Sequence, residues 1–348
     1  MSASAPATTG RGAPGLSPQE PAVVHSDVEC GRRRRVRLTL VALAALTVAA
    51  VLAFGFIDLK GSWEYALGLR ARQVAALLVV GVAVGASSVV FQTIAGSRIL
   101  TPGVMGFDSL YLLVQTVVVY VFGTATFLSL GAQNRFLVNL VLLTMFGLLL
   151  FRWLFRRSSR NLFVLVLIGV VCGSLFAALT SFASRLLSPN DYLTLQDVAF
   201  ASFTTVDADL LGVTAVITAA ACLGFVPLLR RLDIVDLGHD TATGLGVGYH
   251  RVVLTSLVLV TVLVASSTAL VGPMTFLGLI VANLARQLLP THRHAVLVPA
   301  AALVGAICTV LGQTVVVHVF ALTTTLSVVV NLVGGLYFLY LLMRTARL

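Results

Sequence analysis

The residues best suited to chemistry gather in one polar stretch, Leu232–Arg251, which holds three aspartates and two histidines between two long apolar runs. Carboxylates and imidazoles are the side chains that proteins use for proton transfer and for binding metal ions. The sequence, however, contains neither the HExxH pattern of zinc enzymes nor the GxSxG pattern of hydrolases. It also has no paired cluster of cysteine and histidine. We therefore expect no catalytic residue and no metal site in this chain.

Nucleotide hydrolysis by this chain is excluded by its basic residues. A P-loop, GxxxxGK[ST], needs a lysine on the phosphates, and the only lysine is Lys60, which lies in no such pattern. We expect that no cofactor binds here directly and that ATP, where it is used, is hydrolysed by a partner chain. The four cysteines (Cys30, Cys172, Cys222 and Cys308) are scattered without a CxxC spacing, so we expect them to be packing residues.

Composition shows that membrane helices must position the polar stretch. Hydrophobic residues make up 58% of the 348 residues and charged residues only 10%, against about 25% charged in soluble domains. A membrane helix needs roughly 20 apolar residues, and runs of that kind recur along the chain. Small residues dominate them, which favours closely packed helices over a barrel. We expect ten segments, at about 37–57, 73–95, 105–123, 136–154, 162–184, 209–229, 252–271, 277–289, 296–316 and 324–343, of which the eighth is short or half-spanning.

The basic residues predict the orientation in the membrane. The net charge is +10, yet the arginines lie at the ends of apolar runs, as the positive-inside rule requires, and this argues against nucleic acid as a partner. With the N-terminus inside, 18 of the 23 basic residues lie on the cytoplasmic side. The other five are Lys60, Arg70, Arg72, Arg135 and Arg185. We therefore expect a multi-pass protein of the cytoplasmic membrane, in contact with membrane lipid, with both termini cytoplasmic.

Two domains follow from this pattern. Residues 1–31 are rich in Ala, Pro, Gly and Ser and are expected to form a disordered cytoplasmic tail. Residues 32–348 form the ten-helix transmembrane domain. The outer loop 185–208 has apolar spacing typical of an interfacial helix around Tyr192–Phe203.

The polar stretch 232–251 falls on the cytoplasmic side, where it is suited to dock a soluble ATPase. Asp236 can cap a short helix over Leu237–Thr243, which Gly244 and Gly246 would end or turn. Leu245 and Val247 would then be exposed apolar contacts. The alternative is a solvated connector between two spans.

Ionisable groups within the spans are few, which disfavours an ion-coupled secondary transporter without excluding it. Such transporters usually hold carboxylates or histidines near the midplane. Here Asp108 lies near the inner end of the third span, where it is expected to snorkel or cap at the cytoplasmic surface. His318 lies near the outer end of the ninth span and is expected to be interfacial.

Several segments resemble, in the same order, the permeases of ABC importers for iron-siderophore complexes and vitamin B12, the FecCD-type family. "SRILTPGVMGFDSLY" shares Gly106 with the family segment after the second span. "VGPMTFLGLIVANLAR" shares Gly272, Pro273, Gly278 and Arg286, while Ala282-Asn283 replaces a Pro-His pair. The resemblance covers about residues 37–345 and implies an all-α integral membrane protein with the type II ABC importer permease fold.

The same resemblance assigns docking roles. The family's ATPase-docking segment matches Leu237, Gly238, Asp240, Ala242, Leu245, Gly246 and Val247, with departures at His239 and Gly244. Outward arginines of the family pair with acidic residues of the binding protein. Arg72 matches one of them, and Arg70 stands beside Leu69, which replaces the other.

The resemblance implies a permease subunit that moves a ferric siderophore, with a separate nucleotide-binding ATPase, a periplasmic or lipoprotein binding protein and a second permease chain. "ILTP..MGFDSLY" most resembles the subgroup for catecholate, petrobactin-like siderophores. Cobalamin or another metal chelate stays open as the cargo, and a membrane scaffold or sensor is a further, less attractive alternative.

Overall fold

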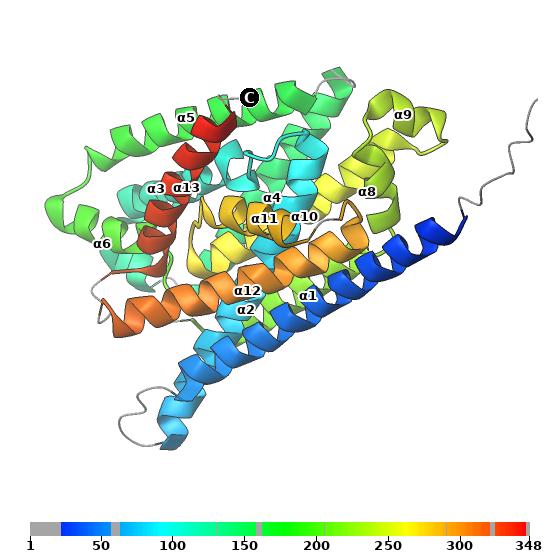
Figure 1. The fold of residues 1–348 in the computed structure, drawn as a ribbon. Coiled ribbons are helices and arrows are strands. Elements are labelled where there is room, and N and C mark those ends of the chain that lie inside the picture. The colour runs from blue at the N-terminus through cyan, green and yellow to red at the C-terminus, as the bar shows by residue number, and fades with distance from the viewer. Residues whose placement is uncertain are drawn as a thin grey trace, which may run out of the picture.

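The computed structural model describes residues 22–56, 63–129, 131–157, 162–204, 206–289, 291–320 and 324–345 (Figure 1). Every regular element within these ranges is a helix. In chain order they are α1 (Ala22–Phe56), α2 (Trp63–Ala95), η1 (Pro102–Met105), α3 (Phe107–Ser129), α4 (Ala132–Arg157), α5 (Leu162–Ser184), α6 (Pro189–Ala199), α7 (Ala208–Phe225), α8 (Leu229–Val235), α9 (His239–Gly244), α10 (Tyr249–Val271), α11 (Leu277–Leu288), α12 (His294–His318) and α13 (Leu326–Thr345).

The predicted membrane segments are confirmed. Nine helices of the described residues are long and apolar enough to cross a membrane: α1 to α5, α7, α10, α12 and α13. The eighth predicted segment is α11, which is apolar but only 12 residues long. Gly272, in a left-handed conformation, ends α10, and Pro273 follows it, so the chain turns back before α11 begins.

The first helix begins earlier than the sequence predicts. Helix α1 starts at Ala22, so the expectation of a disordered tail reaching residue 31 was wrong for residues 22–31. Residues 1–21 lie outside the part of the chain that the structure describes. The helix in the outer loop is present as α6, with Ser188 as its N-cap; the Ser188 hydroxyl accepts a hydrogen bond from the Asp191 amide.

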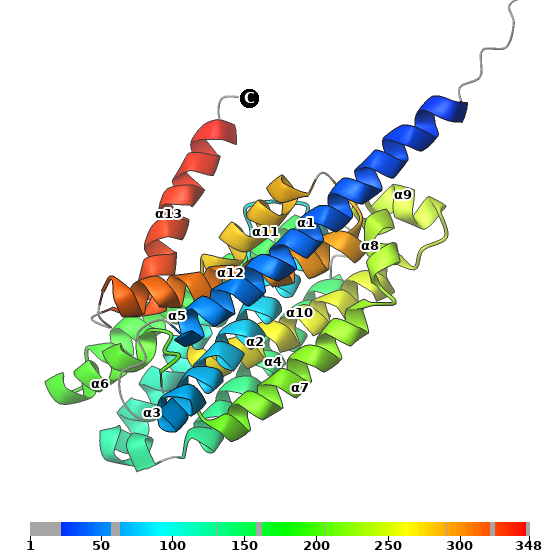
Figure 2. The same cartoon turned by 60° about the horizontal axis from the view of Figure 1, so that its bottom comes forward.

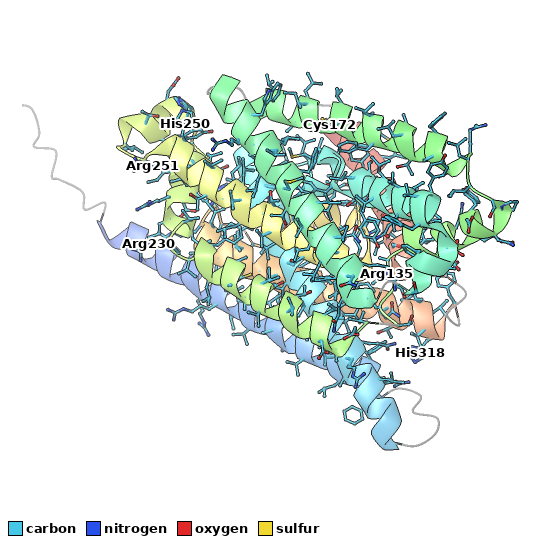
Figure 3. All side chains as sticks on the ribbon, turned by 180° about the vertical axis from the view of Figure 1, so that it is seen from behind. Arg135, Cys172, Arg230, His250, Arg251 and His318 are labelled. Atoms are coloured by element: carbon cyan, nitrogen blue, oxygen red, sulfur yellow. The ribbon has the colours of Figure 1, made fainter. Side chains whose placement is uncertain are left out.

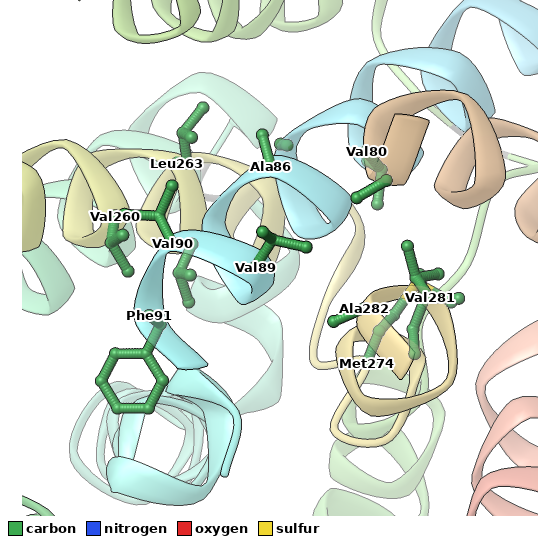
Figure 4. Packing of buried hydrophobic residues seen from close by; sticks show 14 of the residues in the cluster. Val80, Ala86, Val89, Val90, Phe91, Val260, Leu263, Met274, Val281 and Ala282 are labelled. Atoms are coloured by element: carbon green, nitrogen blue, oxygen red, sulfur yellow. The ribbon is translucent and has the colours of Figure 1, made fainter. Parts of the chain in front are cut away.

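Helix α2 forms the centre of the bundle, packed by α12, α10, α11 and α7. In its most apolar 18-residue stretch, 67% is buried inside the bundle, against 17% in the corresponding stretch of α5. Figure 4 shows Val90 of α2 beside Val260 and Leu263 of α10. Other helices therefore surround most of this stretch of α2.

The closest helix pair is the α2–α12 crossing, defined here by Gly81 and Gly85 of α2 and Gly305 of α12. A Cβ atom at Gly81 would lie 2.6 Å from the Ala306 nitrogen, so no side chain fits there. The hydroxyl of Thr309 on α12 donates to the Leu77 carbonyl of α2 over 2.8 Å. Small residues thus allow the two backbones to approach, as is common in membrane helix pairs.

The two ends of the bundle are occupied by different elements. In Figure 2, α8, α9 and the N-terminal part of α1 lie at one end and α6 lies at the other. Figure 3 places Arg230, His250 and Arg251 at the first end, and Arg135 and His318 at the second. This distribution agrees with the two sides that the arginine count assigns to these residues.

Candidate functional site

The stretch 232–251 takes in the end of α8, all of α9 and the first residues of α10, and the two short helices α8 and α9 project from the bundle between α7 and α10 (Figure 1). We call this segment the docking loop, after the role that the family resemblance predicts for it. Leu237 and Leu245 stand on it with 61% of their surface exposed, although both are large apolar side chains. Ala242, between them in sequence, is fully buried. An exposed pair of apolar residues on a short, anchored element is what a protein partner would bind.

The local structure of the docking loop differs from the prediction in two details. Asp236 does not cap α9; it follows the last residue of α8, and Gly238 is the N-cap of α9, with φ of 97° and no side-chain cap. Val247 is half-buried and packs against the core instead of standing exposed. The apolar surface offered by the loop is therefore that of Leu237 and Leu245.

Gly246 turns the chain after α9, as predicted. Its φ is 78°, in the left-handed region that favours glycine. The turn is closed by two backbone hydrogen bonds, from the Gly246 amide to the Thr243 carbonyl and from the Val247 amide to the Ala242 carbonyl. Gly244 is the last residue of α9 and has an ordinary helical conformation.

His239 and Asp240 form the polar part of α9. The Nδ1 atom of His239 lies 2.9 Å from an Asp240 carboxylate oxygen, and the imidazole ring meets the Tyr249 ring edge-on at 4.8 Å. The Asp240 side chain is 98% exposed. His239 thus ties α9 to the beginning of α10 and leaves the carboxylate of Asp240 accessible to a partner.

A buried polar network, which sequence reasoning missed, joins the docking loop to the centre of the bundle. Nδ1 of His294 lies 2.7 Å from an oxygen of Asp233 on α8, and the same oxygen accepts the backbone N–H of His294. Nε2 of His294 lies 2.8 Å from the Thr93 hydroxyl on α2. The imidazole is almost completely buried, so both of its nitrogens need these partners.

Arg286 extends this network to α11. Its Nη2 donates to the Thr93 hydroxyl over 3.3 Å and to the Val89 carbonyl over 3.5 Å. A guanidinium near the last carbonyls of α2 is favourable because the C-terminal end of a helix carries partial negative charge. The only sequence signals for this network were a histidine at the start of one span and an aspartate beside another, which hydropathy cannot pair.

The two outward arginines have different surroundings. Nη1 of Arg70 donates to the carbonyls of Phe54 and Gly55, each over 3.2 Å, and thereby caps the end of α1. Arg72 is exposed. Of the two residues expected to contact a binding protein, Arg72 thus presents its charge to solvent, and Arg70 stabilises the junction of α1 and α2.

The remaining glycines and the proline shared with the family are buried within the helix bundle. Gly106 ends η1 with φ of 95°, and a Cβ atom there would lie 3.0 Å from the Gly173 backbone. A Cβ atom at Gly278 would collide with the buried Ser88. Gly272 and Gly278 line one small cavity of about 30 Å³, and the buried Pro273 follows Gly272 directly. These residues allow the chain to turn and pack here.

Asp108 lies deeper than predicted. Its Oδ2 accepts the Thr275 hydroxyl over 2.7 Å, and it lines the same small cavity. Thr275 precedes α11, whose 12 residues rise by about 17 Å before they end beside the docking loop. The expectation that Asp108 snorkels to the cytoplasmic surface was therefore wrong: it is held inside the bundle by Thr275. His318 is exposed at the other end, as expected.

Comparisons with known proteins agree with this geometry. The model of the FecCD transport family matches residues 38–344. The petrobactin import system permease protein YclO of Bacillus subtilis is 40% identical over 310 residues, which cover 89% of this chain and 98% of that protein. The corresponding permease FatC of Bacillus anthracis is 31% identical over 325 residues and covers 93% of this chain and 92% of its own.

One solved structure shows a similar fold. It is an ABC transporter of the metal-chelate type in an inward-facing conformation. Its chain aligns with a TM-score of 0.76 at 24% identity and covers 88% of the present chain and 99% of its own length.

Proposed function

Because this chain belongs to the FecCD transport family, we propose that it is the permease subunit of an ABC importer that carries a ferric siderophore across the cytoplasmic membrane. The single observation that carries the proposal is the family match over residues 38–344, which takes in all or most of each of the nine candidate spans of the described residues. The chain is a transport permease and not itself an enzyme; ATP hydrolysis is assigned to a separate partner.

The cargo follows from the relatives. Two of them, at 40% and 31% identity, are petrobactin import permeases, and others transport ferric enterobactin and hemin. A catecholate-type ferric siderophore is the substrate class that these names support. The iron would travel inside its chelate, so the protein would need a wide path and no ligands of its own for the metal.

Three partners complete the importer. The ATPase would dock on the exposed Leu237 and Leu245 of the docking loop, and movement of α8 would reach the bundle centre through Asp233, His294 and Thr93. The binding protein would contact Arg72 on the opposite face. A second permease chain would enclose the path together with this one, and many exposed apolar side chains of α5 and α13 are available for it or for lipid.

The proposal also sets the orientation and the division of the chain. The docking loop and both termini would be cytoplasmic, and α6 would lie on the outer face. Residues 1–21 would form a tail that precedes one continuous permease domain. Labelling of single cysteines introduced at Gly244 and near Ser188, by an impermeant reagent on intact cells, tests the orientation.

Transport in proteoliposomes tests the function. The complete importer, with its ATPase and binding protein, should accumulate a ⁵⁵Fe-labelled catecholate siderophore only when ATP is present. Omission of the permease should abolish this uptake. Uptake that follows a proton or sodium gradient without the ATPase would instead favour an ion-coupled transporter with Asp108 as its carboxylate. Preference for cobalamin would change the cargo but retain the class.

A further inference from the structure

A cavity of about 250 Å³ opens beside the docking loop, where α11 ends and α12 begins. Two of its lining residues, Arg286 and His294, also belong to the polar network that joins the docking loop to the centre of the bundle. Half of the residues that line the cavity have side chains that can carry positive charge. These are Arg98, Arg286, His292 and His294, with Asp236 as the single acidic side chain.

The two guanidinium groups of this cavity are poorly compensated by the protein, whereas His294 is paired with Asp233. Arg98 and Arg286 are close enough to repel each other electrostatically. The attraction between Asp236 and Arg286 offsets only part of this repulsion. Within the described residues, no carboxylate lies within salt-bridge distance of either guanidinium. Two neighbouring cations around a hollow raise the local potential and favour an anion there.

Arg286 also has one hydrogen-bond donor that is not used within the described residues. Its Nη2 is used by Thr93 and Val89, but its Nε is buried and finds no hydrogen-bond partner among the described residues. A buried donor without a partner costs free energy, so such groups usually face a ligand or ordered water. By contrast, both ring nitrogens of His294 are bonded to Asp233 and Thr93, which makes this residue a wall of the cavity.

We propose that this cavity binds a phosphate group, held by Arg98, Arg286 and His292. Guanidinium groups bind phosphate strongly through charge-assisted hydrogen bonds. Basic pockets between membrane helices on the cytoplasmic side hold phospholipid headgroups, and a soluble phosphate ion would meet the same donors. The bound group would join α11, α12 and the end of α8, next to the docking loop.

Binding can be measured on the purified full chain with two probes. Inorganic phosphate is titrated calorimetrically in detergent at constant ionic strength, with chloride as the reference anion. In parallel, nanodiscs of phosphatidylglycerol with phosphatidylcholine, or of phosphatidylcholine alone, are used to count retained phosphatidylglycerol by native mass spectrometry. Binding in the first arm identifies soluble phosphate, and retention in the second alone identifies a lipid headgroup. Either result supports the site.

Four variants decide whether the binding belongs to this cavity. Arg98→Gln should weaken it at least about tenfold, since a charge-assisted hydrogen bond is lost. Asp236→Asn should strengthen it about two- to fivefold because a repulsive charge is removed. His292→Gln should weaken it less than Arg98→Gln. The matched control is Arg293→Gln, an exposed neighbour that does not line the cavity.

Three outcomes would overturn the proposal: no binding of either probe, equal loss in the Arg293→Gln control, or no gain from Asp236→Asn. Loss of binding with Arg98→Gln alone cannot be ascribed to misfolding, because this side chain is exposed and the melting temperature is measured alongside. If the cavity instead receives an acidic side chain of the ATPase, neither probe should bind.

Discussion

Glycines serve opposite purposes at the α2–α12 crossing and in the docking loop. At Gly81 an added Cβ atom would lie 2.6 Å from the backbone of α12. At Gly244 and Gly246 no atom of the described residues lies within 4 Å of an added Cβ. The crossing requires the absence of a side chain, whereas the loop requires only a backbone conformation, at Gly238 and at Gly246.

This difference separates stability from function. Side chains added at the crossing must push two buried helices apart, and well-packed interiors resist such changes. Side chains added in the loop point to solvent or to a partner, so they can disturb docking while the fold persists. The following variants test this separation, in order of decreasing change in free energy.

The largest effect is expected from Gly305→Leu at the crossing. Its Cβ atom would collide with the Gly81 backbone, so helices α2 and α12 must separate, at a cost of about 3 kcal/mol or more. The melting temperature of the purified chain in detergent measures this loss. Gly212→Ala on α7, where no described atom lies within 4 Å, is the control and should not lower it. Equal melting temperatures for both variants would refute the close approach.

The second largest effect is expected in the polar network that links the docking loop to α2. Asp233→Ala removes the acceptor of both the amide and the Nδ1–H of the buried His294. Leaving buried donors without partners costs about 1–3 kcal/mol. Asp233→Asn keeps an acceptor oxygen and should lose less. The ratio of ATP hydrolysed to siderophore transported should rise for Asp233→Ala, and an unchanged ratio would show that the network is only structural.

Within the docking loop, Gly246→Val should cost about 1–2 kcal/mol, because a branched residue is forced to a positive φ. Its main consequence should be functional: ATP hydrolysis continues while transport falls. Gly244→Ala, two residues away in a helical conformation, should change stability by less than about 0.5 kcal/mol and leave transport intact. If Gly246→Val transports normally, the loop does not dock the ATPase.

The smallest effect is expected at the opposite face. Arg72→Glu should weaken association with the binding protein by about 1 kcal/mol at low salt, and the loss should shrink as salt is raised. Arg70→Gln should lower the melting temperature instead, since Arg70 caps α1. Surface plasmon resonance at several salt concentrations distinguishes the two. Undiminished docking of Arg72→Glu at low salt would remove this arginine from the interface.

Local features of the sequence predicted most of the fold. Runs of apolar residues place the nine long helices of the described residues, and Gly272-Pro273 marks the break between α10 and α11, because these signals act within a few turns of chain. They also placed the docking loop and the turn at Gly246. The caps at its helices were missed: Asp236 is the C-cap of α8, and Gly238 is the N-cap of α9.

The sequence alone thus determined which segments cross the membrane and, by the positions of its arginines, which loops share a side. Only the tertiary structure decided the partners of the ionisable groups. Thr93 meets His294 across 201 positions of the chain, and Asp108 meets Thr275 across 167. Hydropathy measures the preference of each residue for lipid or water, but it does not predict hydrogen-bond partners. A buried polar side chain loses its contacts with water and needs a partner in the protein. Its partner is then whatever group the packing of distant helices brings within hydrogen-bond distance.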